Sequence, residues 1–422
     1  MTTTQPPATR CPYRLDLKGA DIHREAAALR ALGPATRVLL PGDVPAWSVT
    51  DPDLIRRLLR HPGISKDARR HWPSYINGEI PATWALSTWV GVVNALTAYG
   101  AEHDRLRRPL RAAFSPRRVR ALIPQIKAIT HSLLDDLQAA GPYEVVDLRA
   151  RFAWLLPLRV ANLVLGVPEA LHTPFRDAVG LLFATNVPPA EAQAVPARIY
   201  SLIAQLIDAK RQTPGDDVTS LLIDERDGGE LTEQELADSL LLLISAGHET
   251  TVNLLDHGIT NLATHPSQLA LASTGKIPWK QVVEETLRHQ APIASVPLRF
   301  AVYEVVDEPT GLVFAPGDAL VINYAAAGRD PGRHPHDADG FDVTRGGAGD
   351  HLAFGHGPHL CVGAELARLE GRIAFAALFD RFPTLRLAAP EDLEPLESFI
   401  SNGHKRLPAV LGPARDAQPP TS

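Results

Sequence analysis

Most of the chain has apolar residues at helical spacing, interrupted by short runs typical of strands. Apolar positions in residues 21–32 predict a helix, and residues 51–61 begin with an aspartate and a proline, which favour a helix start. Between them, residues 38–49 have the pattern of a hairpin that turns at 41–43. Helical patterns then dominate from about 100 to about 290. The pattern predicts a small β-rich region beside a larger helical one.

A second strand-rich stretch follows the helices, between Pro297 and Tyr324. Its β-branched runs are residues 302–305, 312–314 and 320–322. An irregular meander at 328–349 comes next, and a last helix is predicted to begin at Cys361 and to end near Asp380. We therefore expect a mainly α fold in one domain over residues 1–422. Its β-rich lobe comprises about 35–50 and 297–325, and its helix-rich lobe about 100–290 and 350–385.

Composition narrows the class of protein. The chain has 422 residues, of which 45% are hydrophobic, so it can bury a large core. A net charge of −6 argues against a general nucleic-acid binder. Residues 1–14 lack an apolar signal segment, and the longest apolar run, 240–244, is too short to span a bilayer. Two cysteines fit a reducing compartment without a disulfide framework, so we expect a cytoplasmic protein. We also expect a monomer without a membrane anchor.

One of the two cysteines, Cys361, ends a glycine-rich loop at the start of the predicted last helix. A thiolate is favoured at a helix N-terminus, and such a sulfur can serve as an axial ligand to heme iron. Two other interpretations are open. Cys361 could be a buried core thiol, or it could bind zinc together with His351, His356 and His359, although zinc sites usually show paired ligands.

A long helix is predicted in the middle of the chain. Residues 232–235 form a capping box, and the pattern continues to Thr264, about 32 residues or about 48 Å. Its centre contains the segment 246–251, in which two small residues leave room for a flat ligand. A threonine hydroxyl there can bond a carbonyl one turn back and open the helix locally. An acid beside a hydroxyl can relay protons, although a threonine pair that only stabilises a core helix is the alternative.

These two segments resemble the signatures of the cytochrome P-450 superfamily. The loop matches F-x-x-G-x-(H/R)-x-C-x-G through Phe354, Gly355, Gly357, His359, Cys361 and Gly363. The helix matches (A/G)-G-x-(D/E)-T-(T/S) through Ala246, Gly247, Glu249, Thr250 and Thr251, with His248 at its variable position. The resemblance implies the cytochrome P-450 fold, in which a long oxygen-binding helix crosses a heme between two lobes. It also implies heme b (iron protoporphyrin IX), O2 as co-substrate, Cys361 as the axial thiolate, and proton delivery through Thr250 and Glu249.

The same resemblance implies a set of cations for the two heme propionates. Buried carboxylates need cations and hydrogen-bond donors. His103 and Arg107 match the H-x-x-x-R of the family, Arg299 matches its strand arginine, and His359 stands two residues before the cysteine. Each alone could be an ordinary surface charge. A further set of arginines is expected to face solvent and to form a docking patch for an acidic electron donor: Arg105, Arg108 and Arg111.

An ion pair is predicted within the helix at 279–289. Glu285 and Arg288 lie on one face at i, i+3 spacing, which alone would suggest a solvated surface pair. The resemblance implies instead a buried pair that locks the meander. Many family members complete it with an arginine where this chain has Gly340, so we expect His336 or Arg345 to replace that arginine. The family's N-R-D-P also has Gly328 in place of asparagine.

The resemblance also predicts a substrate pocket and an activity. Lys66-Asp67, Trp72 and residues 78–81 look like an actinobacterial biosynthetic subgroup that acts on polyketides, macrolides, steroids and peptide-derived products. The activity implied is insertion of one oxygen atom into a bulky, mostly apolar molecule. The pocket is predicted to include residues 182–189, together with Trp72, Tyr75, Ile76, Trp84, Leu86, Trp89, Leu242, Ile293, Ala294, Ser295, Val296, Phe399 and Ile400.

The chain has no flavin module and no iron–sulfur cysteines. Electrons are therefore expected from a separate ferredoxin or flavodoxin and its NAD(P)H-dependent reductase. A peroxide-driven peroxygenase usually lacks the acid–threonine pair that this chain has. A catalytically silent heme protein that recruits a partner or carrier protein remains the alternative from another class.

Overall fold

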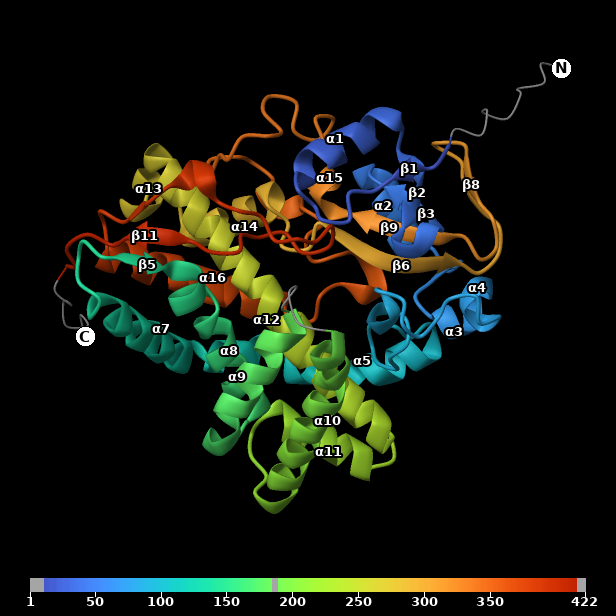
Figure 1. Ribbon diagram of the computed structural model, residues 1–422, viewed down its shortest axis with the longest axis horizontal. Helices are drawn as coiled ribbons and strands as arrows, with labels where there is room; N and C mark the ends of the chain where they lie inside the picture. The colour runs from blue at the N-terminus through green and yellow to red at the C-terminus, as the bar shows by residue number, and fades with distance from the viewer. Residues whose placement is uncertain (1–10, 184–188, 416–422) are drawn as a thin grey trace.

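The computed structural model describes residues 11–183 and 189–415, without side chains at 88 and 180–194, so the predicted pocket segment 182–189 lies almost wholly outside it. Helices make up most of the molecule, and the largest sheet lies toward one end of it (Figure 1). The helices are α1 Ile22–Leu32, α2 Pro52–Arg60, α3 Ala68–His71, α4 Pro73–Ile76, α5 Ala101–Ala113, α6 Pro116–Ala121, α7 Ile123–Gln138, α8 Leu155–Leu165, α9 Glu169–Phe183, α10 Pro189–Gln212, α11 Val218–Asp227, α12 Glu233–Thr264, α13 Pro266–Ser273, α14 Trp279–His289, α15 Tyr324–Gly328 and α16 Ala364–Arg381.

The strands form three sheets in the described part of the chain. The strands are β1 Tyr13–Arg14, β2 Ala35–Leu40, β3 Val44–Val49, β4 Ile64–Ser65, β5 Val145–Asp147, β6 Ser295–Ala301, β7 Val305–Asp307, β8 Leu312–Phe314, β9 Ala319–Asn323, β10 Arg386–Leu387 and β11 Pro408–Val410. The main sheet has the order β1-β2-β3-β9-β6-β4, and it joins the two predicted β-rich stretches through the parallel pair β3 and β9. The other two sheets are β10-β11-β5 and β7-β8.

Three local expectations were wrong. The stretch 302–304 bends instead of forming a strand, because the Val302 N–H bonds the carbonyl of Gly63 while Tyr303 is exposed. Strand β5 interrupts the predicted helical stretch, where it pairs with the distant strand β11. The last helix begins at Ala364, three residues after Cys361, because the Cys361 N–H bonds the Phe354 carbonyl at 2.8 Å and keeps the loop out of helical geometry.

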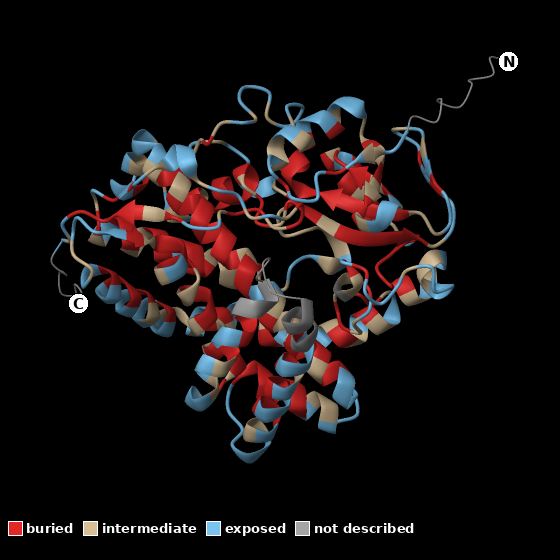
Figure 2. Ribbon diagram, in the orientation of Figure 1, coloured by how far each residue is buried: buried red, intermediate tan, exposed pale blue. Residues whose placement is uncertain are grey.

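Helix α12 is the central element of the helical part. The side chain of Thr232 and that of Glu235 cap its start reciprocally, as the sequence predicts. It contacts α8, α14 and α16, and most of its second half is buried (Figure 2). Apolar residues of α7, α8, α12, α14 and α16 form one large core cluster. The long helix is therefore held on several sides, which makes it a rigid wall for the cavity described below.

Among the described residues, no helix is both long enough and apolar enough to cross a membrane.

Candidate active site

A cavity of about 270 Å³ lies between α12, the loop before α16, strand β6 and helix α5. It brings together residues that are far apart in the sequence. The predicted site residues that line it are Arg107, Leu242, Ala246, Gly247, Thr250, Ile293, Val296, Arg299, Phe354, Gly355, His359, Cys361 and Gly363. A larger groove of about 870 Å³ between α7, α13 and α16 contains none of the predicted site residues.

Cys361 faces this cavity from the loop that precedes α16. The accessible surface of Cys361 faces the cavity and not the outside of the protein. Because the thiol lies inside the protein, burial raises its pKa. The Gly363 N–H and the charges of Arg107 and Arg368 lower that pKa in part. These groups are donors and cations aimed at the sulfur, so they favour the thiolate once a positive metal centre adds its own charge.

The glycines of this loop permit its sharp path. Gly355 and Gly357 have φ of 74° and 71°, a region that residues with side chains rarely adopt. A Cβ on Gly357 would also lie 2.6 Å from the carbonyl oxygen of Leu59. The loop can therefore pack against α2 and still present the cysteine to the cavity.

The opposite wall is formed by the centre of α12. A Cβ on Gly247 would meet nothing within 4 Å, so the space above this glycine is open. The hydroxyl of Thr250 donates to the Ala246 carbonyl at 2.8 Å, and that of Thr251 to the Gly247 carbonyl at 3.2 Å. The helix is nevertheless continuous here, so the predicted local opening is not present. Thr250 lines the cavity and has its hydroxyl oxygen available as an acceptor.

Glu249, the residue before Thr250, does not line the cavity. Its side chain is buried and hydrogen-bonds Ser401 and Asn253. Burial raises the pKa of this carboxyl, while those hydrogen bonds and the charge of Arg149 lower it in part. A carboxyl with a raised pKa exchanges protons more readily near neutral pH. His248, at the variable position, is buried beside the Trp154 ring and does not line the cavity.

Basic side chains gather at one side of the cavity. The rings of His103 and His359 are 4.1 Å apart, and burial lowers the pKa of His359, as do Arg299 and three other nearby basic groups. Arg107 donates to the Leu360 carbonyl of the cysteine loop. Within the described residues, the Nε of Arg299 and the Nε2 of His103 are buried without a hydrogen-bond partner. The four basic residues predicted for the heme propionates therefore lie close together, and two of their nitrogens have no partner within the protein.

Sequence reasoning assigned no cofactor-site role to two further cavity residues. Lys66, which was noted only as part of a subgroup motif, lies at the same basic side. Glu370, on α16, is fully buried with Oε2 unpartnered, and burial raises its pKa to about 8. Neither follows a spacing rule relative to the cysteine. The one available signal was for Glu370, a titratable residue shortly before the apolar run at 373–379.

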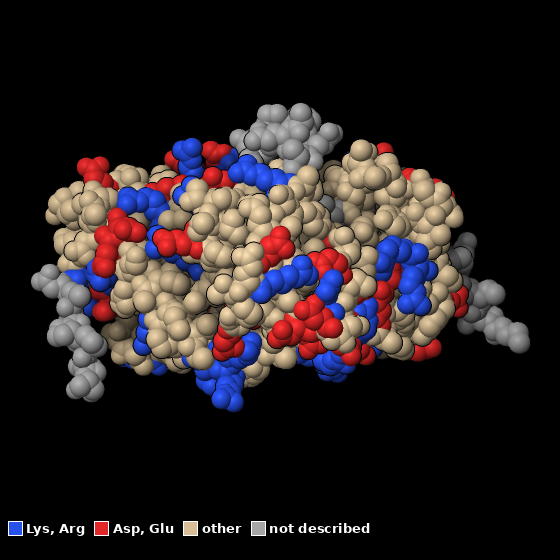
Figure 3. All heavy atoms as spheres, turned by 90° about the horizontal axis from the view of Figure 1, so that it is seen from below, with Lys and Arg blue, Asp and Glu red and all other residues tan. Residues whose placement is uncertain are grey.

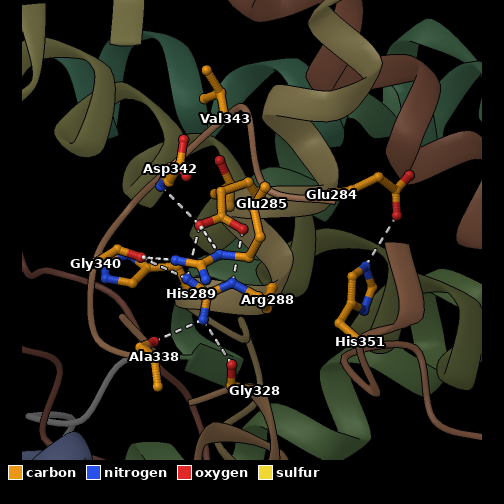
Figure 4. A network of polar contacts seen from close by, with 12 residues as sticks. Glu284, Glu285, Arg288, His289, Gly328, Ala338, Gly340, Asp342, Val343 and His351 are labelled. Atoms are coloured by element: carbon orange, nitrogen blue, oxygen red, sulfur yellow. Dashed lines mark hydrogen bonds and ion pairs between the residues drawn. The ribbon is translucent and has the colours of Figure 1, made fainter. Parts of the chain in front are cut away.

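The predicted pair of Glu285 and Arg288 forms and is fully buried (Figure 4). Two guanidinium nitrogens of Arg288 each lie 2.7 Å from a carboxylate oxygen of Glu285. The remaining donors bond the carbonyls of Gly328, Ala338 and Gly340 at 2.7–2.8 Å. One side chain thus ties α14 to the meander.

Arg345, not His336, supplies the third member of this ionic group. Its Nε lies 3.3 Å from Glu285, and its Nη2 donates to the carbonyl of Gly340, while His336 is exposed. The two glycines that depart from the family pattern have steric reasons. A Cβ on Gly328 would lie 2.2 Å from the Arg288 carbonyl oxygen, and one on Gly340 would lie 1.9 Å from Asp337.

Many of the residues predicted to line the substrate pocket do not line this cavity. Trp72 stacks on Phe300 with ring centroids 5.2 Å apart, and it packs beneath the main sheet. The aromatic loop instead contributes Ala95 and Leu96 to the cavity. Most of the predicted apolar side chains that do not line it are instead buried in, or packed against, the core beside the main sheet, whereas Ile76 is exposed. The predicted residues absent from the lining are Trp72, Tyr75, Ile76, Trp84, Leu86, Trp89, Ala294, Ser295, Phe399 and Ile400.

The predicted basic docking patch is partly neutralised. Arg105 pairs with Glu235 and Arg108 with Glu230, both at 2.5 Å. On the face seen from below in Figure 3, basic and acidic side chains are interspersed. Surface pairs of this kind reduce the long-range field of a patch.

The zinc alternative lacks support in the described residues. They contain no group of three or more His, Cys, Asp or Glu side chains that could hold a metal ion. His351, one of the candidates, instead contacts Glu284 at 3.1 Å.

The residues present fit a flat, dicarboxylate, iron-containing cofactor. A single thiol faces the cavity, which suits a fifth ligand from one side. The opposite wall is free of side chains above Gly247. The Nε of Arg299, which lines the cavity, is an unpartnered donor that could receive a carboxylate, and the Nε2 of His103 nearby is also without a partner.

Comparisons with known proteins agree with this geometry. Residues 279–405 match the model of the family described as cytochrome P450. The chain is 41% identical over 403 residues to 2-hydroxy-5-methyl-1-naphthoate 7-hydroxylase of Streptomyces carzinostaticus, covering 95% of this chain and 98% of the relative. It is 39% identical to cytochrome P450 monooxygenase PikC of Streptomyces venezuelae, covering 99% of each.

Solved structures give the same result. CYP154A1 from Streptomyces coelicolor A3(2) has a TM-score of 0.88 and 50% identity, covering 94% of this chain and 100% of that one. The fold and the site thus define a cytochrome P450, an oxidoreductase. This chain belongs to the cytochrome P450 family, among relatives from actinobacterial secondary metabolism.

Proposed function

We propose that this protein is a heme-thiolate monooxygenase that inserts one oxygen atom of O2 into a bulky, mostly apolar small molecule. The observation that carries the proposal is the cavity that is lined by Cys361 and by Ala246, Gly247 and Thr250 of α12, with the unpartnered Nε of Arg299 at its side. When bound, the heme would supply an iron centre that activates dioxygen. Cys361 would bind its iron through the sulfur, and Arg107, Arg299, His103 and His359 would pair with its carboxylates.

The residues of α12 are proposed to manage protons. Thr250 lines the cavity and holds its own proton on the Ala246 carbonyl, so its oxygen can accept a hydrogen bond from a group in the cavity. Glu249 stands next to it, with a pKa raised by burial. We propose that Glu249 replaces protons that leave through Thr250, while the apolar lining limits bulk water.

The substrate class rests on the lining and on the relatives. The cavity is lined largely by apolar residues of α12, α5 and the segment before β6, including Leu242, Leu243, Ile293 and Val296. Such a surface favours an apolar ligand with few polar groups. One relative is named as a hydroxylase of a methylated hydroxynaphthoate, so we propose a bulky ring system of a natural product as substrate. Electrons are proposed to come from a separate ferredoxin or flavodoxin with its NAD(P)H reductase.

The first test is the absorption spectrum of the purified, dithionite-reduced protein with carbon monoxide. We expect a strongly red-shifted Soret band in the wild type and its loss in Cys361→Ala. A protein that binds no heme, or binds it without that band, would contradict the assignment of Cys361. Thr250→Ala should keep the band and divert consumed oxygen to peroxide, which a peroxide assay during turnover measures.

The silent heme protein is the second candidate. It predicts that screened ligands shift the spin state of the heme without any oxidised product when a surrogate ferredoxin and reductase are supplied. The intact Glu249–Thr250 pair favours the monooxygenase over this candidate.

A further inference from the structure

Lys66 is a buried cation for which the protein itself provides little compensation. It follows strand β4, and it is 2% exposed. Its ammonium nitrogen lies 3.5 Å from the Pro297 carbonyl oxygen, the outer limit of a hydrogen bond. Burial lowers the pKa of Lys66 well below its usual value, and Arg299 lowers it further. Burying an ammonium in this way is costly unless an anion is brought to it.

The acids nearest in sequence or in the cavity are not available to Lys66. The carboxylate of Asp67 is held by Arg69, with both oxygens at 3.0 Å, and it also caps α3. The pKa of Glu370 is raised by burial alone, with no contribution from any neighbouring charge. Across the described residues, no ion pair joins Lys66, Arg107 or Arg299 to a carboxylate. Three cations therefore line one cavity without an anionic partner from the chain.

The positions of these groups indicate where the missing anion would lie. Lys66, Arg299 and His359 all line this cavity. The peptide carbonyl that Lys66 approaches, Pro297, is two residues before Arg299 on β6. The unpartnered Nε of Arg299 belongs to the same side of the cavity. An anion received there would contact both cations at once.

We infer that Lys66 is a further cofactor-binding residue, whose ammonium pairs with the heme carboxylate that Arg299 also receives. This inference rests on the proposed heme cofactor. Because a hydrogen bond to a charged group contributes more than a neutral one, Lys66 should slow the loss of heme. Its charge should also make the heme iron easier to reduce.

The test measures heme transfer from the holoprotein to excess apomyoglobin, followed by absorbance. We expect Lys66→Met to release heme about tenfold faster than the wild type, and its midpoint potential to be lower. Lys66→Arg, which keeps the charge, should restore slow release. Lys127→Met removes an exposed lysine of α7 and should match the wild type.

Heme dimethyl ester, in which both carboxylates are esterified, tests whether Lys66 pairs with a heme carboxylate. With this esterified cofactor, Lys66→Met and the wild type should release it at equal rates, because the charge partner is gone. If Lys66→Met and the wild type released ordinary heme at equal rates, the inference would be overturned. The proposed heme cofactor would still stand if both proteins showed the red-shifted carbon monoxide band. If Lys66→Arg also released heme fast, the shape of the Lys66 side chain rather than its charge would be what retains the heme. A Lys66→Met protein that keeps heme but loses affinity for 2-naphthoate would assign it to a substrate carboxylate; both results overturn the inference.

Discussion

Two groups of buried charges in this protein are built in opposite ways. The first, which we name the meander clasp, consists of Glu285, Arg288 and Arg345. The second, the cationic wall, consists of Lys66, His103, Arg107, Arg299 and His359. Both are assembled from elements that are distant in the sequence, and both are largely removed from water.

The clasp is closed by the protein itself. Arg288 makes five hydrogen bonds, which equals the number of N–H donors in a guanidinium group. The cationic wall is open, since among the described residues the Nε of Arg299 and the Nε2 of His103 find no acceptor. The difference teaches how to separate structure from function: a fully satisfied buried charge holds chain segments together, while an unsatisfied one indicates a ligand.

Breaking the clasp should have the largest effect on stability. Arg288→Met leaves Glu285 buried without its main partner, which should cost about 3–5 kcal/mol in the free energy of unfolding. Arg345→Met removes a 3.3 Å contact to Glu285 and hydrogen bonds to the carbonyls of Asp337 and Gly340, and it should cost less, about 2 kcal/mol. Denaturant titration of both holoproteins checks this, and equal losses would mean that Arg345 carries as much of the clasp as Arg288.

Two buried glutamates extend the comparison to pH. Glu370 has a pKa raised to about 8 by burial, so the folded state binds its proton more tightly than the unfolded state does. Stability from this group is full below the usual glutamate pKa and falls as pH rises toward 8. Glu370→Gln should therefore add about 3 kcal/mol at pH 8 and little at pH 4.5.

Glu284 should respond with the opposite sign. Burial alone would raise its pKa, but hydrogen bonds from His351 and Arg368 lower it to about 2. Its contribution is present above the usual glutamate pKa and is lost as pH falls toward 2. Glu284→Gln should destabilise the protein at neutral pH and not near pH 2. The unfolding temperature of both variants is measured as a function of pH. If Glu370→Gln and Glu284→Gln changed it with the same pH dependence, the predicted opposite signs would be wrong.

Removing a cation from the open wall should weaken cofactor binding rather than the fold. Arg299→Met should cost about 2 kcal/mol in heme affinity, because one charged hydrogen-bond donor is lost. Its urea midpoint after correction for heme content should stay close to that of the wild type. Heme occupancy after dialysis measures the effect, with Arg105→Met as a surface control. If Arg299→Met kept full heme occupancy but had a lower urea midpoint, Arg299 would stabilise the fold, as the meander clasp does, rather than bind the cofactor.

The last prediction concerns turnover rather than stability or cofactor binding, and it is made at Glu249, which belongs to neither group. Glu249→Gln keeps the hydrogen-bonding shape but removes the exchangeable acid, so the turnover rate should fall about tenfold or more. Glu249→Asp should recover part of that rate. Product formation and oxygen uptake with a surrogate redox system measure the loss, and an unchanged rate in the glutamine variant would exclude this acid from the relay.

The sequence anticipated most of the local elements for a physical reason. The capping residues Thr232 and Glu235 and the turn at 41–43 act over a few residues, so their outcome is visible in the pattern. Strand β5 was missed because its partner β11 lies more than 250 residues away. The start of α16 was placed too early because the bond from Cys361 to the Phe354 carbonyl closes the loop first.

The sequence by itself supplied the residues of the proposed chemistry: the thiol of Cys361, the Glu249–Thr250 pair and the pair of Glu285 with Arg288 lie in short segments, which the resemblance to the family identified. Tertiary structure decided which distant groups join them. It brought Arg345 to the clasp and Lys66 to the cationic wall, and it buried Trp72 in the core instead of the cavity. Such contacts depend on how separate elements pack, and packing is set by the burial of the whole chain rather than by the spacing within any segment.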